Sequence, residues 1–135
     1  MKKYLLLIIF TFSTFASFAQ EKGEEVTTYY LIRHAEKNRA DKNNKDPYLT
    51  IKGAERAKRW AEVLSTANID LVYTTNYNRT KETAKPTANQ NGLKLYIYDP
   101  SNMYDEDFKL NTKGKNVVIV GHSNTTNAFA NKILG

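Results

Sequence analysis

Strand-like and helix-like segments alternate along most of this chain. The strand-like segments are rich in β-branched, aromatic and leucine residues, and they span residues 26–32, 70–74, 93–98 and 116–120. Helical patterns cover residues 50–64, 79–89 and 125–134, with a shorter one at 103–110. Such alternation predicts an α/β fold with a mostly parallel sheet and helices on its faces.

Three details refine this expectation. The unbroken apolar run from Val117 to Val120 predicts a central strand that is buried on both faces. Thr50 is a suitable N-cap for the first helix, whose apolar positions include Ala54, and Pro86 should partly break the second helix.

The N-terminus has the layout of a secretory signal peptide. Lys2 and Lys3 precede an uncharged stretch with an apolar centre, and Ser17 and Ala19 occupy positions −3 and −1 of a cleavage site after Ala19. We therefore expect residues 1–19 to be a signal peptide and residues 20–135 to form the domain. Export would place the mature chain in the periplasm or outside the cell, with membrane contact only during export; an uncleaved anchor is the alternative.

Composition excludes several classes of protein. The chain has no cysteine, so disulfides and thiol chemistry are excluded. Its net charge of +6 falls to +4 once the two leader lysines are removed, and the remaining charges are scattered. A cluster of Lys52, Arg56, Lys58 and Arg59 is better explained as a solvated helix face than as a nucleic-acid site. We expect no nucleic-acid partner.

The two histidines of the chain both follow predicted strands. Ligands of open parallel sheets bind beyond the carboxyl ends of the strands. His34 lies there behind Arg33, His122 lies there ahead of a helix, and Arg79 follows the second strand. Arginine forks suit phosphate oxygens, a protonated His122 would add a donor, and a neutral imidazole is a competent nucleophile.

Neither a Gly-rich phosphate loop nor an acidic metal cluster is visible in the sequence, so we expect chemistry without a metal or cofactor. A metal module built on two histidines alone is a weak alternative.

Four segments in order resemble motifs of the histidine phosphatase superfamily, also called phosphoglycerate mutase-like. Residues 31–37 (LIRHAEK) are similar to its Arg-His-Gly signature, with Ala35 in the usual glycine place. Residues 46–57 resemble its Leu-Thr-x-x-Gly helix start, residues 73–84 its Ser-x-x-x-Arg segment with threonine for serine, and residues 118–125 its second-histidine motif.

The resemblance implies a three-layer α/β/α sandwich and hydrolysis of small phosphate monoesters. It implies that His34 becomes phosphorylated, that Arg33, Arg79 and His122 complete a phosphate pocket, and that Lys37 and Asn124 line this pocket. Water would then hydrolyse the phosphohistidine.

The chain departs from the family in three ways. The first is Ala35 in the usual glycine place. The second is that no general acid is evident, and Asp99 and Glu36 are the two candidates. The short connection from Asp99 to Gly114 favours a small phosphatase over a mutase. Family members usually continue with a further strand, so a C-terminally truncated domain is also an expectation.

Three alternatives to the phosphomonoesterase stay open: a protein phosphohistidine phosphatase, a non-catalytic phospholigand binder, and an inactive truncated member. A carboxylate within reach of the leaving-group oxygen would distinguish a catalyst from a binder.

Overall fold

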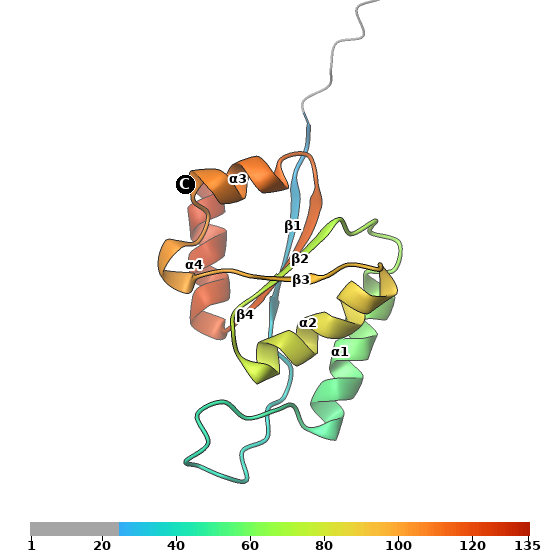
Figure 1. Cartoon of the computed structure of the whole chain (residues 1–135), viewed down its shortest axis with the longest axis vertical. Coiled ribbons are helices and arrows are strands. Elements are labelled where there is room, and N and C mark those ends of the chain that lie inside the picture. The colour runs from blue at the N-terminus through green and yellow to red at the C-terminus, as the bar shows by residue number, and fades with distance from the viewer. Residues whose placement is uncertain (1–24) are drawn as a thin grey trace, which may run out of the picture.

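The computed structural model describes residues 25–135. The expected signal peptide, residues 1–19, lies outside the described residues. The elements in chain order are β1 (Thr28–Arg33), α1 (Ile51–Val63), β2 (Leu71–Thr74), α2 (Asn78–Gln90), β3 (Leu95–Ile97), the 3₁₀ helix η1 (Pro100–Asn102), α3 (Glu106–Thr112), β4 (Asn116–Gly121) and α4 (Ser123–Leu134) (Figure 1). Within residues 25–135, no helix has the length and apolarity needed to cross a membrane.

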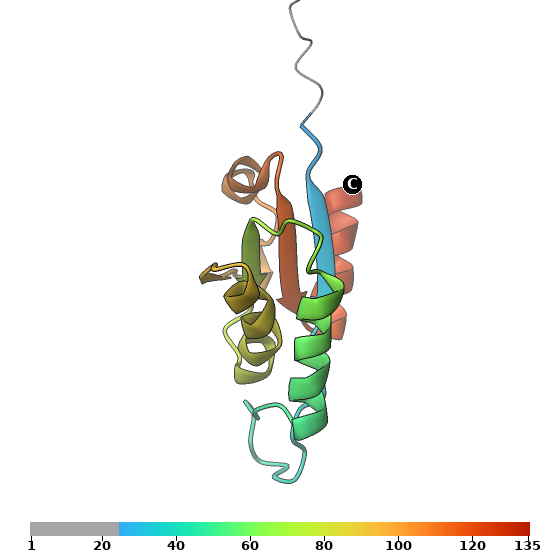
Figure 2. The same cartoon turned by 90° about the vertical axis from the view of Figure 1, so that its right-hand side faces the viewer.

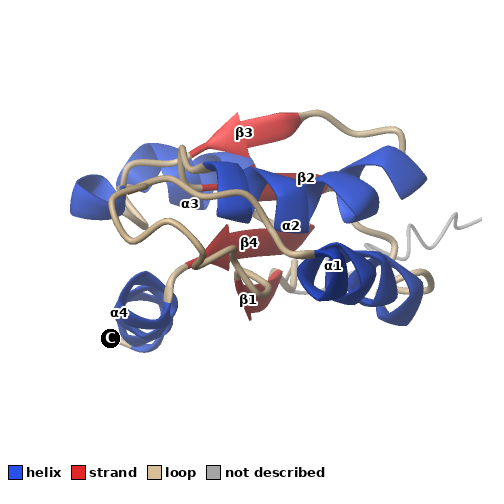
Figure 3. Ribbon diagram, turned by 90° about the horizontal axis from the view of Figure 1, so that it is seen from below, coloured by secondary structure: helices blue, strands red, loops and turns tan. Residues whose placement is uncertain are grey.

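The sheet has four strands, all parallel, in the order β1-β4-β2-β3 (Figure 3). β4 lies between β1 and β2, and its residues Val117 to Val120 are at most 2% exposed. This confirms the predicted central strand and the α/β class.

Two hydrophobic cores lie on the two faces of the sheet, because side chains alternate along each strand. Val118 and Val120 face α1 and α2, where Leu64, Ala84 and Ala88 pack against them. Val117 and Ile119 face the other core, to which α3 contributes Phe108 and α4 contributes Phe129. The molecule is thus the expected three-layer sandwich, with α1 and α2 on one face and α4 on the other (Figures 2 and 3).

Helix α1 begins as predicted after Thr50, whose hydroxyl accepts a hydrogen bond from the Gly53 N–H at 3.0 Å. Its buried positions are Gly53, Ala57 and Ala61. Ala54 is exposed, although it belongs to the apolar pattern that predicted this helix. The helix rotates by about 100° per residue, and the buried stripe that includes Gly53 leaves the next residue outside.

Helix α2 runs without a break through Pro86, and the expected interruption is therefore wrong. Pro86 removes the hydrogen bond to the Glu82 carbonyl, and its ring crowds that carbonyl. The neighbouring residues Thr83, Ala84, Thr87 and Ala88 are buried, and this packing holds the helix in place.

Candidate active site

The two histidines follow neighbouring parallel strands. Arg33, the last residue of β1, pairs in register with Gly121 of β4, and the His34 N–H donates to the Gly121 carbonyl at 2.9 Å. The two imidazole rings consequently lie 5.3 Å apart between centroids, at an angle of 69°. Strand register brings together two side chains that are far apart in the chain.

Gly121, the last residue of β4, lies so close to neighbouring side chains that only a glycine fits there. A Cβ on Gly121 would lie 2.6 Å from both the Tyr98 hydroxyl and the Thr125 Oγ1. The Thr125 Oγ1 in turn accepts from the His122 N–H at 2.8 Å, at the start of α4. A larger residue at 121 would disturb the backbone that carries His122.

One cavity of about 520 Å³ holds all six residues predicted for the phosphate pocket. They are Arg33, His34, Lys37, Arg79, His122 and Asn124. The cavity is also lined by Arg39 and Tyr77, which the sequence analysis did not single out. The structure thus brings the six predicted residues to one cavity, and their chemical roles stay predictions.

His34 is held as a neutral imidazole with one free nitrogen. Its Nδ1 lies 2.7 Å from the Ala35 carbonyl oxygen, and because a carbonyl can only accept, Nδ1 carries the proton. Nε2 therefore keeps its lone pair. Burial lowers the pKa of His34 below its usual value, and the positive charges of Arg79, Arg33 and Lys37 lower it further.

His122 is held by a chain of threonine hydroxyls. Its Nε2 lies 3.1 Å from the Thr75 Oγ1. Thr75 donates its own hydrogen to Thr80 at 3.0 Å, and Thr80 donates to the Thr75 carbonyl at 2.8 Å. The Thr75 oxygen is thus the acceptor, and His122 donates from Nε2. Thr75 occupies the serine place of the family motif, a signal that the sequence analysis noted without assigning a role.

The pKa of His122 is lowered to about 4, first by burial and then by Arg79. The imidazole is therefore neutral at pH 7. The expected role of a protonated His122 as a phosphate donor therefore requires a bound dianion to raise the pKa of His122 first.

Arg79 is a largely buried cation with an unsatisfied donor. Its side chain is 11% exposed, and its Nε is buried without a hydrogen-bond partner. Its Nη1 lies 3.5 Å from the Asp46 Oδ1, and its guanidinium carbon lies 4.5 Å from the centre of the Tyr77 ring. A buried N–H that lacks an acceptor is costly, which suits a site that binds an anion.

The loop between β1 and α1 is tied to helix α2. The Asp46 Oδ1 accepts from the Asn78 N–H at 2.8 Å, and Leu49 N–H donates to the Glu82 carboxylate at 2.7 Å. Asp46 thereby caps α2 from a distant loop, since Tyr77 at the N-cap makes no side-chain capping bond. Asp46 opens the second of the four motifs, and its capping role depends on a contact with α2 that the sequence alone does not show.

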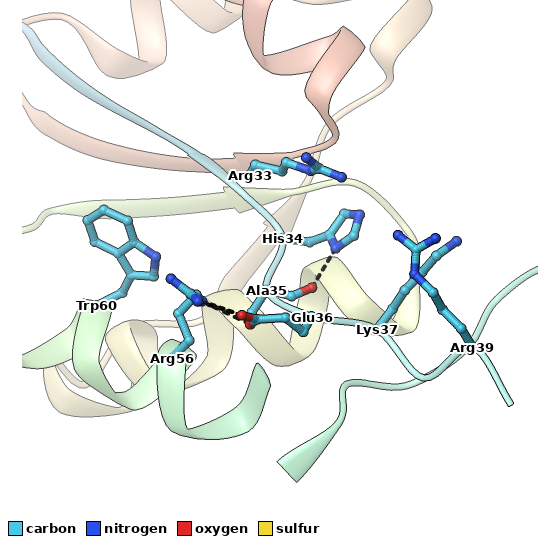
Figure 4. A pocket seen from close by; sticks show the side chains of 8 residues that line it. All are labelled: Arg33, His34, Ala35, Glu36, Lys37, Arg39, Arg56 and Trp60. Carbon is cyan, nitrogen blue, oxygen red and sulfur yellow. Dashed lines mark hydrogen bonds and ion pairs between the residues drawn. The ribbon is translucent and has the colours of Figure 1, made fainter. Parts of the chain in front are cut away.

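Neither candidate general acid is available as a proton donor. The Glu36 carboxylate accepts from the Arg56 Nε at 2.9 Å through both oxygens and is turned away from His34 (Figure 4). This bond lowers the pKa of Glu36 to about 2. Asp99 is exposed and caps η1 by accepting from the Ser101 N–H at 2.8 Å, which lowers its pKa.

Both carboxyl groups are therefore ionised at neutral pH, and the structure argues against either as the acid. No aspartate or glutamate of residues 25–135 lines the cavity that His34 and His122 share. Groups of three metal-ligating side chains are likewise not found in that part of the chain.

A family model and several solved structures are similar to this chain. The family model of the histidine phosphatase superfamily (branch 1) matches residues 29–100, which is more than half of the chain. The SixA protein from Agrobacterium tumefaciens is similar at 23% identity and a TM-score of 0.62, covering 81% of this chain and 77% of that one.

Two further solved structures are similar. The protein histidine phosphatase SixA with tungstate has 13% identity and a TM-score of 0.62, covering 76% of this chain and 73% of that one. A mycobacterial glucosyl-3-phosphoglycerate phosphatase with VO3 has 14% identity and a TM-score of 0.59, covering 76% and 78%. The search of curated proteins found no match.

Proposed function

The chain belongs to the histidine phosphatase superfamily, and from this premise we propose that it is a phosphatase that hydrolyses phosphate monoesters through a covalent phosphohistidine on His34. The observation that carries the proposal is the state of His34. Its Nδ1 proton is committed to the Ala35 carbonyl, its Nε2 is free, and it shares one cavity with Arg33, Lys37 and Arg79.

In the first step, the Nε2 lone pair attacks phosphorus, and the bond from phosphorus to the ester oxygen breaks. The Ala35 carbonyl stabilises the positive charge that develops on the ring, because it accepts from Nδ1. The arginine and lysine side chains offset negative charge on the phosphoryl oxygens, so no metal is required. In the second step, water attacks phosphorus, the P–N bond breaks, and its electron pair returns to Nε2.

The leaving group must depart without a carboxylic acid in the cavity. We expect it to take its proton from water or to leave as a weak base. A general acid typically contributes about 10²- to 10⁴-fold, so the enzyme should favour aryl esters and other good leaving groups over simple alkyl esters.

The first test is hydrolysis of p-nitrophenyl phosphate by the full chain in EDTA, beside His34→Ala and with circular dichroism as the check of folding. We expect turnover that a folded His34→Ala variant loses, and transfer of labelled phosphoryl groups to wild-type protein only. A second variant, Arg79→Gln, removes one cation from the cavity. Its control is Arg59→Gln, which removes an exposed arginine of α1 outside the cavity. A folded wild-type protein that binds phosphate but turns over no phosphoester would establish a binder instead.

A second measurement compares p-nitrophenyl phosphate with phenyl phosphate, whose phenol resembles tyrosine with a pKa near 10. We expect a much lower kcat/KM for the poorer leaving group. Equal values would reveal a general acid that our reasoning excludes.

A protein phosphohistidine phosphatase is the second candidate function. The cavity without a carboxylate favours it, because an imidazole leaves from phosphorus as a weaker base than an alkoxide. The likeness to SixA supports it as well. Preference for a phosphohistidine peptide over a matched phosphoserine peptide would select this alternative.

We also propose that residues 1–19 direct export, on the basis of the charged start, apolar centre and small residues before Gln20. Expression of the full chain in a bacterium, followed by mass spectrometry of the exported fraction, tests this. We expect a mature N-terminus at Gln20, and an intact chain retained in the cytoplasm would refute it.

A further inference from the structure

The cavity around His34 holds more positive charge than one phosphoryl group needs. Four permanent cations line it, namely Arg33, Lys37, Arg39 and Arg79. Arg79 has Asp46 beside it. Arg33, Lys37 and Arg39 form no salt bridge with any residue in the described range 25–135. Both histidines are neutral at pH 7, so they do not change this balance.

A second cavity of about 430 Å³ continues from the first. It shares Arg33, His34, Lys37 and Arg39 with it and extends to Arg56 and Trp60. Arg56 is neutralised by Glu36, so the excess charge does not lie at that end. Lys37 and Arg39 line both cavities, and their side chains lie on the side of His34 away from Arg56 and Trp60 (Figure 4).

Charge arithmetic points to the occupant. A phosphate monoester carries about −1.5 to −2 at pH 7. With Asp46 counted, one such group leaves the cavity positively charged. Unpaired cations that converge on one cavity, free of protein carboxylates, match a ligand with a further anionic group.

We propose that the substrate carries a second anionic group, a carboxylate or a second phosphoryl group, which Lys37 and Arg39 bind while the reacting phosphoryl group lies at His34. This inference rests on the proposed function and adds the class of substrate. Arg39 presents a planar fork that suits either group, and the Lys37 ammonium of the same cavity adds a point charge. Arg39 is then a specificity-determining residue.

Three small phosphonates, which cannot be hydrolysed at the P–C bond by this chemistry, make the test direct. Methylphosphonate has one anionic group, phosphonoacetate adds a carboxylate, and methylenediphosphonate adds a second phosphonate. Their binding to the full chain is measured by isothermal titration calorimetry. We expect one or both of the two larger probes to bind about 10-fold or more tightly than methylphosphonate, because a hydrogen bond to a charged group contributes that much. Comparison of the two identifies the second group.

Two matched substitutions locate the effect. Arg39→Gln should reduce this preference to about twofold or less, whereas Arg59→Gln, which removes an exposed arginine outside both cavities, should keep it. Equal binding of the three probes to the wild-type chain would overturn the inference. A preference that survives Arg39→Gln in the folded variant would overturn the assignment to Arg39.

The inference and the proposed function fail separately. Hydrolysis of p-nitrophenyl phosphate with no preference among the phosphonates would refute the second anion site and leave the phosphatase. Preferential binding with no turnover of any phosphoester would refute the phosphatase and leave an anion-binding cavity.

Discussion

Gly53, in the first turn of α1, offers a test in which two physical effects predict opposite signs. Replacement of a helix glycine by alanine ordinarily stabilises a protein by about 1 kcal/mol. In this chain, a Cβ on Gly53 would lie against the Glu36 backbone, 3.1 Å from the Glu36 carbonyl carbon. The Glu36 carbonyl oxygen is closer still, and this oxygen already accepts from the Thr50 N–H at 2.8 Å.

The magnitude follows from these contacts. Ordinary van der Waals contact for a Cβ begins at 3.4 Å, so the clash with the Glu36 oxygen requires backbone on one side to move by roughly 1 Å. Overpacking of this kind costs about 1–3 kcal/mol, and weakening the bonds to the Glu36 carbonyl adds roughly 0.5–1.5 kcal/mol. After the gain in helix propensity is subtracted, we expect Gly53→Ala to lower the free energy of unfolding by about 2 kcal/mol.

Urea denaturation followed by circular dichroism measures this change. Ala54→Gly is the control, because Ala54 is the exposed neighbour in the same turn and should lose about 1 kcal/mol through propensity alone. Displacement of Glu36 also moves Ala35 and His34, so kcat/KM for p-nitrophenyl phosphate should fall with stability. A Gly53→Ala variant as stable as the wild type, or more so, would refute the reasoning.

Three further predictions use the same assays. Asp46→Ala should destabilise the chain by about 1 kcal/mol because it removes the cap of α2, and Asp46→Asn should keep most of that stability in urea denaturation. Because the pKa of His122 is about 4 in the folded protein, the unfolded chain takes up more protons as the pH falls from about 6.5 to about 4, so stability should drop by roughly 1–2 kcal/mol, after a discount for partial exposure. His122→Asn should flatten this dependence in denaturation measured across that range. Glu36→Gln should leave kcat for phenyl phosphate, whose leaving group would need an acid, within about threefold, and a loss of a hundredfold or more would identify Glu36 as the acid.

The sheet and its flanking helices were predictable because their signals are local. The apolar run at 117–120 needs two covered faces, and β4 occupies the centre of the sheet. The Thr50 cap marks the start of α1 through a bond between residues three apart. Pro86 shows where local reasoning failed, because burial of its neighbours on α2 outweighs the one backbone bond that proline removes.

Assembly of the cavity was partly predictable. In a parallel sheet, residues after the strands meet at one edge, so His34 and His122 were expected together and the register of β1 with β4 brings them together. The candidate acids could not be judged in this way. Glu36 and Asp99 are close in sequence or position to the site, but their partners decide their protonation: Arg56 lies twenty residues from Glu36, and the Ser101 bond makes Asp99 a cap.

The sequence by itself determined the strand and helix alternation, the Thr50 cap of α1 and the two histidines at strand ends, because each depends on a residue and its near neighbours. Tertiary structure decided the ionisation of those histidines, the threonine chain that orients His122 and the attachment of the loop at Asp46 to α2. It also placed Arg39 in the same cavity as Lys37 and the two histidines. These properties depend on burial and on charges brought close by folding, and a linear pattern contains neither.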